Sequence, residues 1–191
     1  MKIGVVLVTY NRLDKLKISL ECYDKQTYLP EYVLVVNNNS TDDTKKYLDD
    51  WKKKKANYDK IVLNLPSNIG GSGGFHEGLK KSLKLSADWV WVADDDAFPK
   101  NDCFEKAKKY LEENDTKDIS GKVLNRGKID LTHRRRIKNL GLFPLQTIPG
   151  TKNYNKDSFE IQLFSYVGTL INKKKMNEVG ITKIFNLLFP P

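Results

Sequence analysis

Three consecutive aspartates, Asp94, Asp95 and Asp96, follow the apolar run 89–93. Adjacent carboxylates repel one another, so ionising all three costs free energy unless a positive charge lies among them. A hard divalent cation that takes oxygen ligands would remove this cost. At the end of a buried strand, such side chains also project into the crevice where open α/β sheets bind ligands. The triplet by itself leaves two interpretations open, a cation-binding strand end and a solvated acidic turn.

A glycine-rich segment at 70–74 follows Asn68 and Ile69, and it contains four glycines in five residues. Glycines allow positive φ and close approach of the backbone to a ligand. Because helical spacing of apolar residues begins at Phe75, the free amide groups here would suit a phosphate or a sugar. No Gly-Lys-Ser or Gly-Lys-Thr sequence follows, so the segment is not a Walker phosphate loop. A simple glycine turn is the alternative.

Two more polar segments come directly after predicted strands. Thr9, Tyr10 and Arg12 follow the first strand, where the tyrosine ring offers a flat face to a base and the other two side chains offer hydrogen bonds. Asn37 and Asn38 follow the second strand, and their amides could bond to the edge of a nucleobase. The alternative is that both segments only begin the helices that come next.

Strands and helices alternate along the first 120 residues. The largely apolar runs at 3–8, 32–36, 61–65 and 88–93 predict four strands, and the first two are expected to be buried on both faces. Apolar residues at spacings of three and four predict a helix after each strand: Leu13, Leu16, Leu20 and Tyr23; Thr44, Tyr47, Leu48 and Trp51; Phe75, Leu79 and Leu83; Phe104, Ala107, Tyr110 and Leu111.

This order predicts the α/β class, with a mostly parallel sheet and helices on both of its faces. Asn11 and Ser40 are expected to cap the first two helices. The carboxyl ends of parallel strands meet at one edge, so the four polar segments should converge there. One metal-bound diphosphate fits all four, with its base near the first two strand ends, its phosphates near the aspartates and its sugar near the glycines.

The pattern changes after about residue 121. Residues 121–158 are polar and basic with little periodicity, 159–167 alternate as in a strand, and 172–179 are consistent with a short helix. The basic stretch 132–138 is interpreted as a solvated loop. Contact of this stretch with an anionic lipid surface or a lipid-linked acceptor is the alternative.

The chain of 191 residues has a formal net charge of +9, which favours anionic partners. Its lysines are scattered and no aromatic-rich basic motif accompanies them, so nucleic acid is not an expected partner. Cys22 and Cys103 lie in helical apolar patterns and are predicted to be buried thiols of a reducing compartment, which favours a cytoplasmic protein. We expect no signal peptide, and no apolar run is long enough to span a bilayer.

Taken together, the four polar segments resemble those of the family 2 glycosyltransferases, which have the Rossmann-like GT-A fold. The matching motifs come in the family's order and spacing, and they lie at 8–12, 37–42, 68–75 and 94–97. The GGSGGF and DDDA forms are similar to the galactofuranosyltransferase and rhamnosyltransferase branch in particular.

The resemblance implies a role for each site residue. The nucleoside would be held by Thr9, Tyr10, Arg12 and Asn38, and by Asn37, where the family usually has Asp. Asn68, Gly70 and Gly71 would lie along the ribose and the diphosphate. Asp94 and Asp96 would bind the Mn²⁺ or Mg²⁺ ion, and Asp95 would lie close to the sugar or the ribose.

The implied reaction is inverting transfer of a sugar from a nucleotide diphosphate donor to a polysaccharide or lipid-linked acceptor of the capsule or cell wall. UDP-galactofuranose, another UDP-hexose or dTDP-rhamnose would be the donor. Residues 1–120 would form the nucleotide-sugar-binding core, and 121–191 a truncated part of the acceptor side of the same domain. The protein would be cytoplasmic or peripheral at the inner face of the membrane.

One departure from the family concerns the general base. In the family an acidic cluster beyond a Val-Gly pair supplies this base, and no such cluster follows Val179 and Gly180. The general base is therefore unassigned, and we expect donor binding with impaired transfer. The alternative is a non-catalytic sugar-nucleotide-binding module that a partner chain completes. A nucleotidyltransferase is disfavoured because no basic glycine-rich loop follows the first strand.

Overall fold

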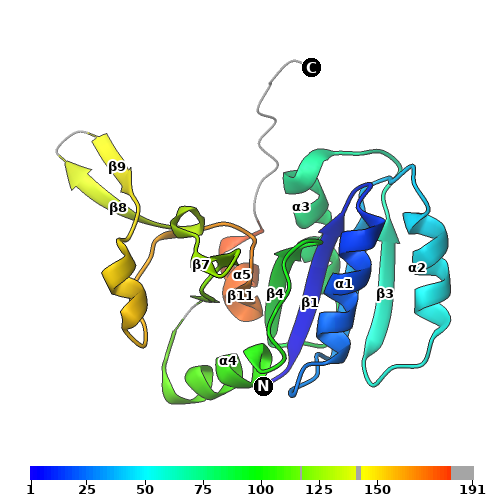
Figure 1. Cartoon of the computed structure of the whole chain (residues 1–191), viewed down its shortest axis with the longest axis horizontal. Coiled ribbons are helices and arrows are strands. Elements are labelled where there is room, and N and C mark those ends of the chain that lie inside the picture. The colour runs from blue at the N-terminus through cyan, green and yellow to red at the C-terminus, as the bar shows by residue number, and fades with distance from the viewer. Residues whose placement is uncertain (117, 141–142, 182–191) are drawn as a thin grey trace.

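The computed structural model describes residues 1–116, 118–140 and 143–181. Its centre is a six-stranded sheet with the strand order β3-β2-β1-β4-β11-β5 (Figure 1). Four neighbouring strands are parallel: β1 (Ile3–Thr9), β2 (Tyr32–Asn37), β3 (Asp59–Asn64) and β4 (Trp89–Asp94). Next to them, β11 (Thr169–Asn172) runs antiparallel between β4 and β5 (Asp118–Ser120). The predicted α/β class with a mostly parallel sheet is confirmed.

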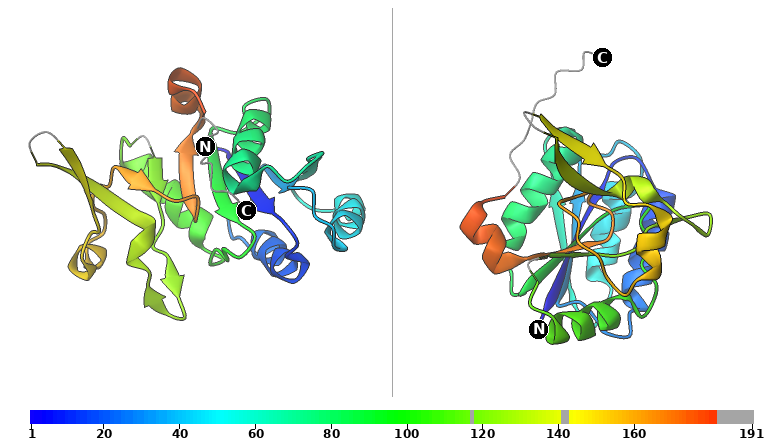
Figure 2. Two further views of the ribbon diagram at one scale, coloured as in Figure 1. Left: turned by 90° about the horizontal axis from the view of Figure 1, so that it is seen from above. Right: turned by 90° about the vertical axis from the view of Figure 1, so that its left-hand side faces the viewer.

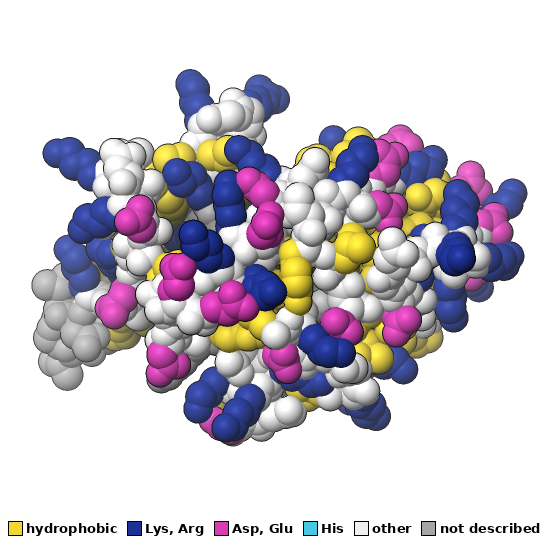
Figure 3. Space-filling model, turned by 90° about the horizontal axis from the view of Figure 1, so that it is seen from below, with side chains coloured by type: hydrophobic (Ala, Val, Ile, Leu, Met, Phe, Trp, Pro, Cys, Tyr) yellow, Lys and Arg dark blue, Asp and Glu magenta, His cyan; other side chains and the backbone are white. Residues whose placement is uncertain are grey.

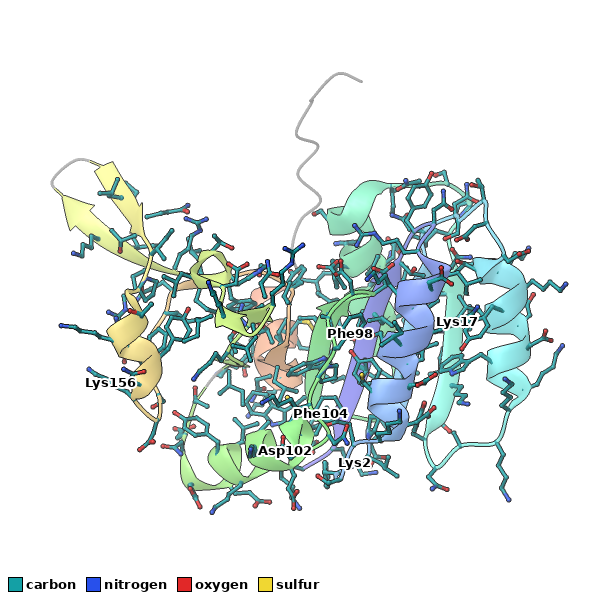
Figure 4. All side chains as sticks on the ribbon, in the orientation of Figure 1. Lys2, Lys17, Phe98, Asp102, Phe104 and Lys156 are labelled. Carbon is teal, nitrogen blue, oxygen red and sulfur yellow. The ribbon has the colours of Figure 1, made fainter. Side chains whose placement is uncertain are left out.

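Helices cover both faces of the sheet, as the sequence predicts (Figure 2). Side chains of a strand point alternately to its two faces, so β1 sends Val5 and Leu7 into one core and Val6 and Val8 into the other. The first core also holds apolar side chains of α1 (Leu13–Asp24), α2 (Thr44–Lys53) and α4 (Cys103–Glu113). The second holds those of α3 (Gly70–Ser82) and α5 (Lys173–Val179). Figure 4 shows Phe104 of α4 beside the sheet.

Helix α3 lies unusually close to the sheet because two of its glycines face the strands. A Cβ atom added at Gly74 would lie 2.7 Å from Val8 Cγ1, and one added at Gly78 would lie 2.5 Å from Val6 Cγ1. The predicted glycine loop is therefore wrong in part, since α3 begins at Gly70 and the glycines form its first turn. Close packing on β1 fixes the start of α3 near the strand ends.

The chain order reverses at β1, which makes this part of the sheet a switch point. From β1 the chain continues to β2 and β3 on one side, and β4 then pairs on the other side of β1. The carboxyl ends of β1 and β4 meet at this switch point, where α1 and α4 follow on one face of the sheet and α3 packs on the other. Open α/β sheets bind ligands at this position.

Between β5 and β11 the chain leaves the sheet and builds a lobe from residues 121–168 (Figure 1). The lobe contains two short hairpins. Its strands are β6 (Leu124–Asn125), β7 (Lys128–Ile129), β8 (Arg134–Leu140), β9 (Phe143–Thr147) and β10 (Leu163–Phe164). Single turns of 3₁₀ helix at Leu131–His133 and Thr151–Asn155 join them.

The lobe corrects two predictions. The basic stretch 132–138, interpreted as a solvated loop, is mostly strand β8, and Arg134 is buried. Its guanidinium donates hydrogen bonds to the carbonyl oxygens of Gly121 and Val167, both at 2.8 Å, and burial lowers its pKa to about 10. The strand predicted at 159–167 is limited to β10, because the chain joins the sheet only at Thr169, whose side chain is buried.

Smaller predictions had mixed outcomes. The helix predicted at 172–179 is confirmed as α5, with Asn172 as its N-cap. Neither Asn11 nor Ser40 caps a helix, because α1 and α2 begin further along the chain. Cys22 and Cys103 are half-buried free thiols rather than fully buried ones.

Within the described residues, no helix has the length and apolar character needed to cross a membrane. Residues 182–191, the last part of the predicted acceptor-side region, lie outside the described residues.

Candidate functional site

The register of the sheet aligns the predicted site residues at its carboxyl edge. Thr9 pairs with Asn37, and Asn37 with Asn64, so three polar residues stand side by side at the ends of β1, β2 and β3. On the other side of β1, Val8 pairs with Asp94, which places Asp95 level with Thr9. Sequence reasoning missed Asn64, whose only signal is its position at the end of the third strand.

A charged cluster links the ends of β1 and β4 across the switch point. Asp95 is only 3% exposed and accepts a hydrogen bond of 2.7 Å from the Thr9 hydroxyl. Arg12 Nη1 lies 3.4 Å from Asp95 Oδ1 and 2.7 Å from Asp96 Oδ2. The Asp95 and Asp96 carboxylates raise the pKa of Arg12. Burial raises the pKa of Asp95, although the Thr9 hydrogen bond and Arg12 oppose this shift.

Asp94 is the third carboxylate of the cluster and has a different environment. Burial raises its pKa to about 6, and the neighbouring Asp96 and Asp95 carboxylates add to this shift. The more distant charge of Arg12 opposes it. Asp94 is thus a half-buried carboxylate whose negative charge the protein compensates poorly. This environment is expected of a carboxylate that binds a cation.

A second cluster joins the end of β2 to the start of α3. The buried Asn38 donates from Nδ2 to Asn68 Oδ1 at 2.9 Å and to the Gly70 carbonyl at 3.0 Å. Its Oδ1 accepts from the Ile69 amide at 3.0 Å. Asn68 Oδ1 also accepts from the Gly70 amide at 2.9 Å. The three hydrogen bonds of the Asn38 side chain therefore hold the turn at the start of α3 in place.

The loops after β1 and β2 are also tied to each other. Asn11 has φ of 52°, and its Oδ1 accepts from the Thr41 amide at 2.7 Å. Its own amide donates to the Ser40 hydroxyl at 3.1 Å. The buried Asn37 accepts from the Ser40 amide at 2.9 Å and donates to Asn64 Oδ1 at 2.9 Å. These bonds explain why Asn11 and Ser40 are not helix caps, since their side chains hold two loops together.

The glycines divide into two groups by what surrounds them. Gly70 has φ of +74°, and a Cβ added at Gly70 or Gly71 would meet nothing within 4 Å. Gly73 and Gly74 instead pack against neighbouring side chains. The open pair therefore presents bare backbone to solvent at the start of a helix, a position that suits an anion, and the Gly70 amide is held in place there by its hydrogen bond to Asn68.

Several predicted site groups are exposed around this edge. Tyr10, Arg12 and Asp96 are exposed beside the charged cluster, and Phe98 is exposed just beyond the aspartates (Figure 4). The structure thus brings Thr9, Arg12 and the three aspartates into one cluster. It brings Asn38, Asn68 and Gly70 into another. Tyr10 lies in the loop after β1 and Gly71 in the first turn of α3, and neither forms a hydrogen bond with the two clusters in the described part of the chain.

No group of three or more His, Cys, Asp or Glu side chains that could hold a metal ion occurs among the residues the structure describes. Asp94 and Asp96 therefore do not form a complete protein cage. Two carboxylates still suit Mg²⁺, which takes few protein ligands and completes its shell with substrate phosphates and water.

An open cleft of about 580 Å³ lies at the other edge of the sheet, near the amino ends of β2 and β3. Tyr28, Pro30, Tyr58 and Asp59 are among its lining residues. We place the candidate site at the carboxyl edge instead, because the switch point and both side-chain clusters lie there.

Curated proteins with similar sequences are glycosyltransferases. The galactofuranosyltransferase GlfT1 of Mycobacterium tuberculosis is 39% identical over 92 residues, which are 48% of this chain and 29% of that protein. The uncharacterized glycosyltransferase YwdF of Bacillus subtilis is 32% identical over 115 residues, or 59% of this chain and 39% of that protein. The matched segments thus span well under half the length of these curated relatives.

Solved structures share the fold at low identity. Residues 1–349 of S. aureus TarS in complex with UDP superpose with a TM-score of 0.64 at 20% identity, covering 94% of this chain and 49% of that one. The mannosyltransferase PcManGT of Pyrobaculum calidifontis, solved with GDP-Man and Mn²⁺, gives a TM-score of 0.54 at 23% identity, covering 62% and 34%.

The family model described as "Glycosyl transferase family 2" matches residues 4–180, which include nearly the whole sheet, the strand-end clusters and the lobe. The chain therefore belongs to glycosyl transferase family 2.

Proposed function

We propose that this chain binds a nucleotide diphosphate sugar at the carboxyl edge of its sheet and transfers the sugar to a polysaccharide or lipid-linked acceptor. The observation that carries the proposal is the convergence of two clusters at the switch point. One is the ionised cluster of Thr9, Arg12 and Asp95, and the other is the open turn at Gly70 and Gly71. A nucleotide diphosphate sugar needs both kinds of surface side by side, polar side chains for its base and open backbone for its diphosphate and ribose.

The buried amides have a supporting role in this proposal. Asn37 and Asn38 use their side chains within the protein, so they hold the loops that surround the donor. The exposed ring of Tyr10 and the guanidinium of Arg12 then face the nucleoside, and Gly70 and Gly71 allow the diphosphate and ribose to approach the backbone. Residues 1–120 would hold the donor, and the lobe would contribute to the acceptor side.

A divalent cation, Mn²⁺ or Mg²⁺, fits the aspartates for an electrostatic reason. Asp94 is half-buried with a raised pKa, and Asp96 is exposed at the same edge, so both could hold a cation together with donor phosphates. When bound, the cation would neutralise charge that develops on the leaving diphosphate. Arg12 pairs with Asp96 in the structure, and cation binding would shift Arg12 towards Asp95 or the donor.

The donor class rests on sequence. The segment similar to galactofuranosyltransferase GlfT1 points to UDP-galactofuranose, with another UDP-hexose or dTDP-rhamnose as further candidates. Transfer would invert the anomeric centre, as an acceptor hydroxyl attacks opposite the leaving diphosphate. No general base is assigned: of the lobe acids, Asp130 accepts hydrogen bonds from Thr132, and beyond the lobe Glu178 pairs with Lys175.

Calorimetric titration with UDP and Mn²⁺, beside assays of donor hydrolysis and transfer, tests the proposal. We expect metal-dependent UDP binding that Asp96→Asn weakens at least tenfold. Asp102→Asn is the matched control, because Asp102 is also exposed and paired with a cation, Lys106, but lies away from the site (Figure 4). Equal UDP affinity for both variants, or no binding to any nucleoside diphosphate, would exclude the site.

The same experiment addresses a second candidate function. Strong UDP binding without hydrolysis or transfer would identify a sugar-nucleotide-binding module that needs a partner chain for catalysis. The unassigned general base is the observation that favours this candidate, because proton transfer typically contributes a factor of about 10²–10⁴ to the rate.

A further inference from the structure

The β8–β9 hairpin is a basic, partly apolar surface that the proposed transfer site does not use. It projects from the lobe and slants away from the sheet (Figures 1 and 2). Ile137 on β8 is 41% exposed, Leu145 on β9 is 52% exposed, and Ile148 just after β9 is 47% exposed. Three large aliphatic side chains exposed on one short projecting element are a mark of an interaction surface.

Within the chain segment that carries these aliphatic side chains, the charged residues have one sign. Figure 3 shows Lys and Arg side chains over much of one face of the molecule, with Asp and Glu side chains interspersed. The segment 131–156 differs, because it contains six Lys and Arg residues and no Asp or Glu. It therefore carries +6 of the formal net charge of +9.

Several of these cations are free to meet a partner. Arg134 is buried, and Arg136 donates to the Glu160 carbonyl at 2.9 Å, so both have structural roles. The other four are Arg135, Lys138, Lys152 and Lys156 (Lys156 is labelled in Figure 4). None of these four forms a salt bridge within the described part of the chain.

The pairing of the strands mixes the two kinds of side chain on both faces of the hairpin. Lys138 pairs with Leu145, so a cation and an aliphatic side chain share one face. Arg135 and Ile137 share the opposite face, because alternate residues of a strand point the same way. Neither face is purely polar, so a partner that attracts the cations would also cover aliphatic surface.

We propose that the β8–β9 hairpin docks the protein on the surface of an anionic lipid bilayer. The hairpin would enter the membrane surface edge-on, because Ile137 and Leu145 lie on its opposite faces. Lys and Arg would lie among the headgroups, and the aliphatic side chains of both faces would reach the boundary with the acyl chains. A soluble polyanion would satisfy the cations but would leave the aliphatic side chains in water. The combination of both therefore fits a lipid surface better than a free glycan or a nucleic acid. Such docking would bring the lobe next to membrane-held molecules.

Co-sedimentation with vesicles tests this proposal. We expect the unmodified chain to bind vesicles of phosphatidylglycerol and phosphatidylcholine and to bind pure phosphatidylcholine at least tenfold more weakly. Replacing Arg135→Gln and Lys138→Gln together should lower the partition coefficient about fivefold per charge, the factor for about 1 kcal/mol. The control is the pair Lys45→Gln and Lys46→Gln on α2, which removes the same charge from another exposed surface.

A second pair of variants tests the aliphatic part. Leu145→Ser should lower the partition coefficient about fivefold, whereas Ile18→Ser on α1, which removes a side chain with a similar exposure of 48%, should leave it unchanged. Circular dichroism and UDP titration check that each variant is folded and binds donor as before. Equal binding by Leu145→Ser and the unmodified chain would overturn lipid docking. If the chain bound soluble polyphosphate as tightly as anionic vesicles, lipid docking would also be overturned, and the hairpin would be identified as a polyanion site.

Discussion

Replacing Gly78 by alanine tests how α3 is held against the sheet, and therefore how the turn at Gly70 and Gly71 is positioned. A Cβ atom at this position would lie 2.5 Å from Val6 Cγ1 and 2.9 Å from Val36 Cγ2. Both valines are fully buried on central strands, and their β-branched side chains have little rotational freedom. Carbon atoms in contact normally lie at about 3.5–4.0 Å, so the helix would have to move by roughly 1 Å.

The magnitude follows from two opposing terms. Overpacking a core usually costs about 1–3 kcal/mol. Alanine is favoured over glycine inside a helix by up to about 1 kcal/mol, which offsets part of that cost. We therefore expect Gly78→Ala to lower the free energy of unfolding by about 1–2 kcal/mol.

Gly71→Ala is the matched control on the same helix. A Cβ atom there meets nothing within 4 Å, and Gly71 is not among the glycines with positive φ, so only the helix preference acts. This variant should gain up to about 1 kcal/mol of stability. It should at the same time weaken UDP binding, because the added methyl group occupies space proposed for the diphosphate.

Urea denaturation of both variants measures the free energy of unfolding, with the midpoint compared at constant slope. The two substitutions are chemically identical and should shift the midpoint in opposite directions. A shift in the same direction for both would refute the account of α3 packing. Unchanged UDP affinity in Gly71→Ala would refute the proposed position of the diphosphate while leaving the packing account intact.

Three further predictions concern single side chains. Asn38→Ala should lower the free energy of unfolding by about 2–3 kcal/mol, because three hydrogen bonds of roughly 1 kcal/mol each are lost. It should also speed hydrogen exchange of the Ile69 amide, and an unchanged exchange rate would contradict the role of Asn38 in holding this turn. Burial raises the pKa of Asp94 to about 6, so the folded protein binds the proton of Asp94 more tightly than the unfolded chain does. The contribution of this protonation to the free energy of unfolding is therefore full at low pH and is lost as pH rises through 6. In EDTA, Asp94→Asn should therefore be more stable than the unmodified chain at pH 7.5 by about 2 kcal/mol and show a flatter pH profile in urea titrations, whereas parallel profiles would argue against this environment. Burial raises the pKa of Cys103 to about 11, so alkylation by iodoacetamide at pH 8, followed by mass spectrometry, should be about a hundredfold slower than for a free thiol; rapid labelling would contradict the burial.

The sequence predicts the sheet and the convergence of the strand ends well because both depend on local patterns. Runs such as 3–8 and 32–36 contain only hydrophobic residues and glycine, and short runs of this kind rich in β-branched residues are typical of a strand buried on two faces. The parallel order then places Thr9, Asn37 and Asp95 at one edge without any knowledge of side-chain contacts. Family resemblance and geometry agree on this edge for that reason.

Hydrogen-bond partners were harder to predict because they depend on how loops from different strands meet. Asn11 and Ser40 have the sequence context of helix caps, but each finds a partner in the other loop. The bounds of the short strands of the lobe were not predicted because β6, β7 and β10 have only two residues each, too few for a periodic pattern, and β10 pairs with β8, which is distant in the chain. Burial of Arg134 has no sequence signal, since it stands in a run of three arginines.

The lobe begins and ends at almost the same point in space. The Gly121 amide donates to the Gly168 carbonyl at 2.9 Å, and the hydroxyls of Ser120 and Thr169 lie 2.8 Å apart in the flanking strands. A segment whose two ends touch can lengthen, shorten or be exchanged without moving the strands that carry it. Residues 122–167 can therefore be exchanged as a unit, by evolution or by an engineer, while the carboxyl edge of the sheet stays fixed.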